Sequence, residues 1–180
     1  MALFRQQTDN ARATDRRFGA AALLEQLRSQ IRQLEDLLHH AVLADQRAPL
    51  AIALSEASTL AGWTTLDVGS THQAWQHYET AKAAARESES PVLLAHATAE
   101  QAFPLLDVGE THSVIELLAE VRAHAEPTTP ELQRAWLAAA AGEAFAAVGQ
   151  RDDALRAFDA ADALVPEDRR HPDLPFVFLG

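Results

Sequence analysis

The sequence predicts an all-α protein in which antiparallel helix pairs stack into a solenoid behind one long N-terminal helix. Three observations lead to this prediction. Aromatic residues make up only 6% of the 180 residues and alanine is frequent, which favours helices over sheets. Glycines recur at intervals of 40 residues, at Gly69, Gly109 and Gly149. Leucines in the N-terminal quarter are spaced by three and four residues, as on one face of a helix.

The N-terminal quarter is predicted to contain a tail, residues 1–15, and a long helical region, residues 16–47. The helix itself should run roughly from Arg16 to Asp45. Leu23 and Leu37 widen its apolar stripe, which favours packing on the first helix pair as a cap. The strict stripe can instead form a coiled-coil seam between two copies, and one helix can serve both purposes. The stripe consists of Leu24, Leu27, Ile31, Leu34, Leu38 and Ala41.

Residues 48–166 are predicted to form three helix pairs of about 40 residues each. Small residues, the hinge glycine and one large residue return at the same offsets in every copy, which is hard to obtain by chance. The three copies read Gly62, Gly69, Ala74, Tyr78 and Ala81, then Ala102, Gly109, Val114, Leu118 and Val121, then Gly142, Gly149, Ala154, Phe158 and Ala161.

Each copy carries residues that typically begin and end the helices of a helical hairpin. Pro49, Pro91 and Pro130 lie 18 to 20 residues before the hinge glycine, where proline suits the first helical position. Ser90 and Thr129 precede two of these prolines as candidate N-caps. The glycine can adopt the left-handed conformation that ends the first helix. Since one pair cannot bury its apolar face alone, the pairs should stack.

These offsets resemble the tetratricopeptide repeat (TPR), and the third copy, which continues to Pro166, matches best. The resemblance covers roughly residues 50–166 and implies a right-handed superhelical solenoid. The period exceeds the usual 34 residues of the family by about six. We place the excess in the linkers 87–90 and 126–129 and in longer helices.

A narrower resemblance concerns the C-terminal part of actinobacterial regulators, in which an Xre-type helix-turn-helix precedes a sensory TPR array. It rests on the strings Asp15-Arg16-Arg17-Phe18-Gly19, Gln26-Leu27-Arg28, Leu60-Ala61-Gly62-Trp63 and Ala95-His96-Ala97. Residues 1–17 are too few for a helix-turn-helix. The resemblance therefore implies either the sensor half of a regulator or a stand-alone relative.

The C-terminal residues 167–180 are expected to begin a truncated fourth repeat. They follow Pro130 by about the repeat length and carry an apolar stub rather than a polar capping face. The alternative is that they fold back as a cap on the helix predicted at residues 151–164. The stub consists of Phe176, Val177, Phe178 and Leu179.

The TPR resemblance also implies a binding face, because first helices line the concave side in that family. Flat aromatic surfaces with a few polar anchors would suit a peptide, a protein segment or a small molecule. The only basic residue expected nearby is Arg134, so a cationic or neutral ligand is favoured over a carboxylate. The candidate ligand-binding residues are Glu56, Thr59, Trp63, His96, Phe103, Trp136 and Glu143. For Trp63 and Trp136, a role as core fillers is the alternative.

Composition excludes several other functions. The net charge is −11, and residues 48–180 carry most of the acidic excess, so we expect no direct nucleic-acid binding. The chain has no Cys, no signal-like start and no long apolar run, which predicts a cytoplasmic protein without disulfides or a membrane span. The eight histidines lack metal-ligand spacing, and no nucleophile or phosphate-loop motif occurs. We therefore expect neither an enzyme nor a cofactor or metal site.

Two functions remain open. The first is a ligand- or peptide-binding TPR module that forms the sensory and dimerising part of a transcriptional regulator, with residues 16–45 as a candidate homodimer contact. The second is a scaffold that docks a partner protein's segment in its concave groove. The regulator-like strings and the aromatic side chains favour the first.

Overall fold

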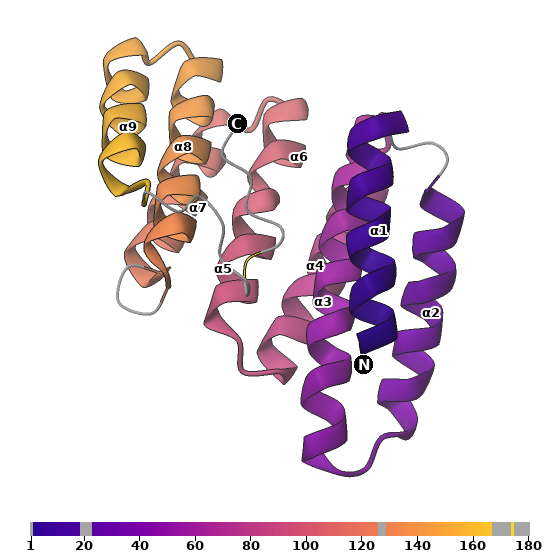
Figure 1. Cartoon of the computed structure of the whole chain (residues 1–180). Coiled ribbons are helices and arrows are strands. Elements are labelled where there is room, and N and C mark those ends of the chain that lie inside the picture. The colour runs from indigo at the N-terminus through magenta and orange to yellow at the C-terminus, as the bar shows by residue number, and fades with distance from the viewer. Residues whose placement is uncertain (1, 19–22, 126–128, 167–173, 175–180) are drawn as a thin grey trace. The chain divides into compact units, whose positions relative to one another are not determined.

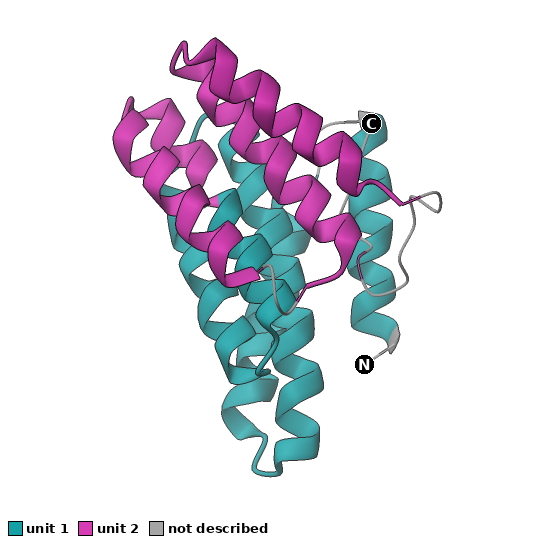
Figure 2. Cartoon of the chain, turned by 90° about the vertical axis from the view of Figure 1, so that its left-hand side faces the viewer, with its two compact units in different colours: residues 1–100 teal, residues 101–180 magenta. Residues whose placement is uncertain are grey.

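The fold was examined in a computed structural model of the chain, which describes residues 2–18, 23–125, 129–166 and 174. Every regular element in these ranges is a helix (Figure 1). The chain divides into two compact units, residues 1–100 and 101–180 (Figure 2). Unit 1 contains α1 (Ala2–Phe18), α2 (Leu24–His40), α3 (Ala44–Asp67), α4 (Thr71–Glu87) and α5 (Pro91–Glu100). Unit 2 contains α6 (Ala102–Asp107), α7 (Thr111–Ala125), α8 (Glu131–Ala147) and α9 (Arg151–Leu164).

The three predicted hinges lie at the predicted glycines. Gly69, Gly109 and Gly149 have φ values of 79°, 80° and 81°. The residue after each glycine closes the helix end, as when the Ser70 N–H donates to the Thr65 carbonyl at 3.0 Å. In consequence α4 packs on α3, α7 on α6, and α9 on α8. The prediction of antiparallel helix pairs is confirmed.

The first helix of the second pair is interrupted between α5 and α6. Pro104 stands in the first turn of α6 and has no N–H to donate to the carbonyl of Glu100. The missing bond explains why one helix becomes two at this point. The boundary between the two units falls at the same place.

The N-terminal region differs from the prediction of a tail followed by one long helix. Residues 2–15, predicted as part of a tail, belong to α1, and the predicted helix over Arg16–Asp45 is divided among α1, α2 and α3. After α2 the backbone becomes extended, with φ −74° and ψ 121° at Ala41.

A long-range contact explains the break between α2 and α3. Arg47, in the first turns of α3, donates through Nη1 to the carbonyls of Leu38 at 3.0 Å and Ala41 at 2.7 Å. These are carbonyls that the end of α2 leaves without a helical partner. Arg47 Nε also donates to Glu87 Oε1 at 2.7 Å, which connects the break to the end of α4.

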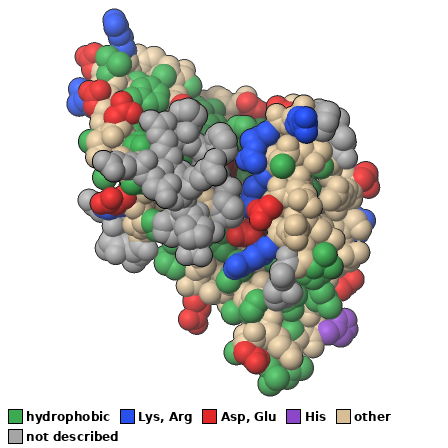
Figure 3. Space-filling view, in the orientation of Figure 1, with side chains coloured by type: hydrophobic (Ala, Val, Ile, Leu, Met, Phe, Trp, Pro, Cys, Tyr) green, Lys and Arg blue, Asp and Glu red, His purple; other side chains and the backbone are tan. Residues whose placement is uncertain are grey.

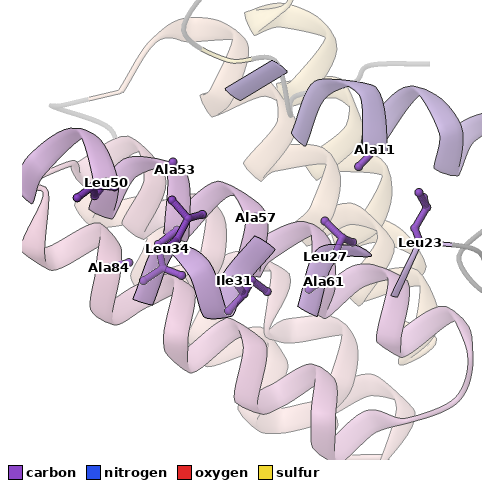
Figure 4. Packing of buried hydrophobic residues seen from close by; sticks show 11 residues of the cluster. Ala11, Leu23, Leu27, Ile31, Leu34, Leu50, Ala53, Ala57, Ala61 and Ala84 are labelled. Carbon is purple, nitrogen blue, oxygen red and sulfur yellow. The ribbon is translucent and has the colours of Figure 1, made fainter. Parts of the chain in front are cut away.

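The apolar stripe of α2 packs inside the chain. Leu27, Ile31 and Leu34 are buried in one cluster with side chains of α3 (Figure 4). On α3 the facing side chains include Leu54 and Ala57. These three residues are therefore covered by other side chains of the same chain.

Three details of the predicted helix starts can be compared with the structure. Pro49 lies inside α3 rather than at its first position, because α3 already begins at Ala44. Ser90 acts as the predicted N-cap, and its Oγ accepts from the Leu93 N–H at 3.3 Å. Thr129 does not cap α8, since its hydroxyl donates backwards to the Ala125 carbonyl at 2.8 Å. The predicted fourth-repeat stub or cap at residues 167–180 lies outside the described residues, apart from the buried Leu174.

Candidate functional site

The seven predicted ligand-binding residues divide between the two units. Four lie on unit 1 and three on unit 2, and each group is described separately. On α3, spacings of three and four residues place Glu56, Thr59 and Trp63 on one face. Glu56 and Thr59 are buried, whereas Trp63 keeps 43% of its surface exposed. The Thr59 hydroxyl donates to the Ser55 carbonyl at 2.9 Å, within its own helix.

Glu56 is covered by α1, the helix that the sequence did not predict. Its carboxylate interacts electrostatically with Arg12 and Arg5 of α1. Burial raises the pKa of the Glu56 carboxyl, and the two arginines partly offset that rise. Arg side chains gather along α1, with acidic side chains between them (Figure 3).

Arg12 is the central cation of this cluster and is 8% exposed. Its Nη1 lies 2.8 Å from Asp9 Oδ1 on the same helix. Burial lowers the pKa of the Arg12 guanidinium, while Glu56 and Asp9 act in the opposite direction. A buried arginine is stable only when anions accompany it, and α3 supplies one of them.

His96 of α5 is a further buried polar residue of unit 1. It is 5% exposed, and burial together with the positive charge of Arg12 lowers its pKa to about 3. The imidazole is therefore neutral at pH 7, so its Nε2 forms no ion pair with Glu100 Oε1, 3.9 Å away. Glu100 Oε2 accepts from the Tyr78 hydroxyl at 3.3 Å. Burial, with the Glu100 charge second, raises the pKa of Tyr78 well above its usual value.

The three predicted residues of unit 2 are more accessible. Phe103 on α6 and Trp136 on α8 are partly buried, and Glu143 on α8 is exposed. Partial desolvation raises the pKa of the Glu143 carboxyl. Unit 2 therefore offers one exposed carboxylate and two aromatic side chains that are partly accessible.

Sequence reasoning missed the contribution of α1 to this site. It placed Arg134 as the only basic residue near the predicted groove, whereas Arg12 and Arg5 act on Glu56. Among the described side chains of α1, Thr8, Ala11 and Arg12 are buried and Phe4 is partly buried, so polar residues interrupt the apolar period that could have revealed this face.

Among the described residues, no group of three or more His, Asp or Glu side chains is arranged to hold a metal ion. None of the helices in the described part of the chain combines the length and apolar character that a membrane crossing needs.

Comparison with known proteins agrees with this architecture. No family model matches the chain, and no curated protein matches it. Among solved structures, the chain is similar to a protein of Podosopora anserina with nearly identical TPR-like repeats, assigned as a kinesin light chain. The likeness covers 93% of this chain and 97% of that chain, with a TM-score of 0.51 and 16% identity. The chain therefore has the fold of TPR-like helical-repeat proteins, an all-α solenoid of helix pairs.

Proposed function

We propose that the chain is a non-catalytic TPR-like module that binds a peptide, a protein segment or a small molecule. The observation that carries this proposal is the exposure of Trp63. A large aromatic side chain that served only as a core filler would be buried, yet 43% of this one is open to solvent. Exposed aromatic side chains are the usual anchors of binding surfaces.

The predicted contact residues have two different roles in this proposal. Trp63, Phe103 and Trp136 supply apolar contact area, and Glu143 supplies an exposed carboxylate. The buried predicted residues Glu56, Thr59 and His96 could contact a ligand only if α1 were displaced. On unit 2, the aromatic side chains and the carboxylate favour a ligand with an apolar group and a neutral or positive end.

We further propose that the module is the sensory part of a bacterial transcriptional regulator and acts in the cytoplasm. The support is the resemblance of its N-terminal strings to Xre-type regulators. DNA contact would then belong to another domain, because the acidic excess of residues 48–180 repels phosphates. The alternative is a scaffold that docks a partner's segment, and the TPR-like fold supports both.

Thermal unfolding with a panel of hydrophobic peptides and metabolites tests the binding proposal. A ligand that binds only the folded chain raises the melting temperature. Trp63→Ala and Trp136→Ala should abolish the shift while helical circular dichroism is retained. Trp75→Ala is the matched control, since Trp75 is a partly buried tryptophan on α4 outside the predicted site. The binding proposal is wrong if the two site variants lose helicity, or if the control variant abolishes the shift in melting temperature equally.

The gene sequence upstream of Met1 distinguishes the sensory role from the scaffold role. The reading frame immediately upstream of Met1 should encode a helix-turn-helix if the chain is the sensor of a regulator. An upstream region that encodes none, together with a ligand that proves to be a protein segment, would favour the scaffold.

A further inference from the structure

Helix α1 is attached to unit 1 largely through polar side chains. Among its described side chains, Thr8, Ala11 and Arg12 are buried, and Phe4 is partly buried against the apolar cluster of unit 1. Leu3 has the bulk to fill a core, but it stays 67% exposed. A helix that buries so little apolar area gains little from the hydrophobic effect.

Specific hydrogen bonds take the place of apolar packing. Gln30 of α2 donates through Nε2 to Thr8 Oγ1 at 2.9 Å and to the Phe4 carbonyl at 3.2 Å. Thr8 in turn donates to the Phe4 carbonyl at 3.1 Å. These bonds set the register of α1, in which Ala11 joins the apolar cluster of unit 1 and the partly buried Phe4 packs against it.

This register brings Arg12 to two of the predicted ligand-binding residues. The guanidinium interacts electrostatically with Glu56 of α3 and lies near enough to His96 of α5 to affect its proton. Both residues belong to the face on which a TPR-like module is expected to bind. Within unit 1, a segment of the chain itself therefore occupies part of that face.

We propose that α1 is an intramolecular ligand of unit 1, and that the natural partner is an arginine-bearing helical segment that replaces it. This inference rests on the proposed binding function. The site selects arginine because a competitor that covers Glu56 without bringing a cation would leave the carboxylate buried and uncompensated. A competitor without a guanidinium loses binding free energy because it buries the Glu56 carboxylate alone. An arginine-bearing helix instead supplies a cation for Glu56.

The attachment of α1 to unit 1 is suited to replacement of α1 by a partner helix. Polar and ionic contacts give register and specificity, while the small apolar contribution keeps the net stability of the docked helix low. A partner helix with additional apolar side chains could gain from Trp63 on the same face of α3, which remains partly open. The docked α1 would reduce the apparent affinity of every weaker ligand, because only the undocked fraction can bind.

The test uses the full chain and a fluorescein-labelled synthetic peptide of residues 2–18. Arg12→Glu in the chain should weaken docking of its own α1 and leave the site to the peptide. By fluorescence anisotropy, we expect the peptide to bind the variant about ten-fold more tightly than the wild type. A peptide that carries Arg12→Glu should bind neither chain. Arg17→Glu is the matched control, since it makes the same charge change at an exposed position of α1.

Hydrogen exchange on the wild-type chain gives a measurement that does not depend on a variant. The amides of α1 should exchange faster than those of α3, since a displaceable helix opens more often than the core. Equal protection of the two helices would overturn the proposal even if Arg12→Glu failed to fold. It would also be overturned if the peptide failed to bind a folded Arg12→Glu chain.

The two proposals fail separately. A melting-temperature shift that depends on Trp63 and Trp136 can persist while the α1 peptide does not bind, and then only the intramolecular ligand is wrong. If no ligand shifts the melting temperature but the peptide binds, α1 docking stands as an internal contact of unit 1, and its role as a stand-in for a partner is wrong.

Discussion

Gly62 and Tyr78 approach so closely that a Cβ on the glycine would stand 2.6 Å from Cε1 of the ring. The ring is fully buried, and its hydroxyl is bonded to Glu100. Gly142 and Phe158 repeat the relationship in the third pair, also at 2.6 Å. There the ring is 37% exposed. The aromatic side chain at the helix crossing is therefore confined in the first pair, whereas in the third pair it can move toward solvent.

This difference predicts unequal effects of one substitution. Gly62→Ala should lower the free energy of unfolding by about 2 kcal/mol, since Tyr78 cannot move aside without losing its bond. Gly142→Ala should be nearly neutral, because Phe158 can turn toward solvent and alanine gains about 1 kcal/mol in helix propensity. Urea unfolding followed by circular dichroism measures both. Equal losses in the two variants would contradict the distinction.

The repeat architecture could be predicted from sequence because each copy repeats the same local chemistry. Hinge glycines and small residues at helix crossings act through their own backbone, and their spacing is visible in one dimension. The register of α1 could not be predicted, because Thr8 is bonded by Gln30 of α2 and Arg12 interacts electrostatically with Glu56 of α3. The break after α2 could not be predicted for the same reason, because the Arg47 side chain that stabilises it lies on the next helix. Exposure of Trp63 and burial of Glu56 on one face likewise depend on what α1 covers.

The turn between α4 and α5 offers a stabilising substitution. Glu89 has a φ of 53°, a left-handed conformation that a non-glycine residue adopts only with strain. The three hinges use glycine at the equivalent point. Glu89→Gly should therefore raise the free energy of unfolding by up to about 1 kcal/mol. Thermal unfolding tests this, with Glu89→Ala as a control that removes the charge and keeps the strain. A gain shared by both variants would attribute the effect to charge.

Removing Arg47 should loosen the connection from α2 to α3. Arg47→Ala leaves the end carbonyls of α2 without this donor and Glu87 without its cation, for a loss of about 2 kcal/mol. Arg47→Lys should recover little, because an ammonium group lacks the planar fork that reaches several acceptors together. Arg32→Ala, on the exposed side of α2, is the control. Full recovery by lysine would indicate that charge alone matters.

A homodimer through residues 16–45 can be tested without removing α2 from the core. Leu37, Val42 and Leu43 are 47%, 87% and 57% exposed, so they offer apolar surface for a dimer contact in this region. Leu37→Glu should therefore convert any such dimer to a monomer by light scattering. A monomeric wild-type chain would reject this contact.

Burial of His96 predicts that the chain loses stability as the pH falls. The unfolded imidazole has a pKa of 6.5 and the folded one about 3, so protons favour the unfolded chain. The contribution is fully present above pH 6.5 and declines from there toward pH 3. At pH 5 the loss should be about 2 kcal/mol, at about 1.4 kcal/mol per pH unit. Urea unfolding at a series of pH values measures the slope.

Other groups around His96 titrate as well, so the comparison must be made between variants. The raised pKa of Glu56 acts in the opposite direction, because its folded form binds a proton more readily. His96→Gln keeps a polar side chain of similar size and removes only the imidazole titration, so its stability should depend less on pH between 6.5 and 5. His112→Gln, which makes the same change at an exposed position, is the matched control. A slope unchanged by His96→Gln would show that His96 accepts a proton in the folded chain as readily as in the unfolded one.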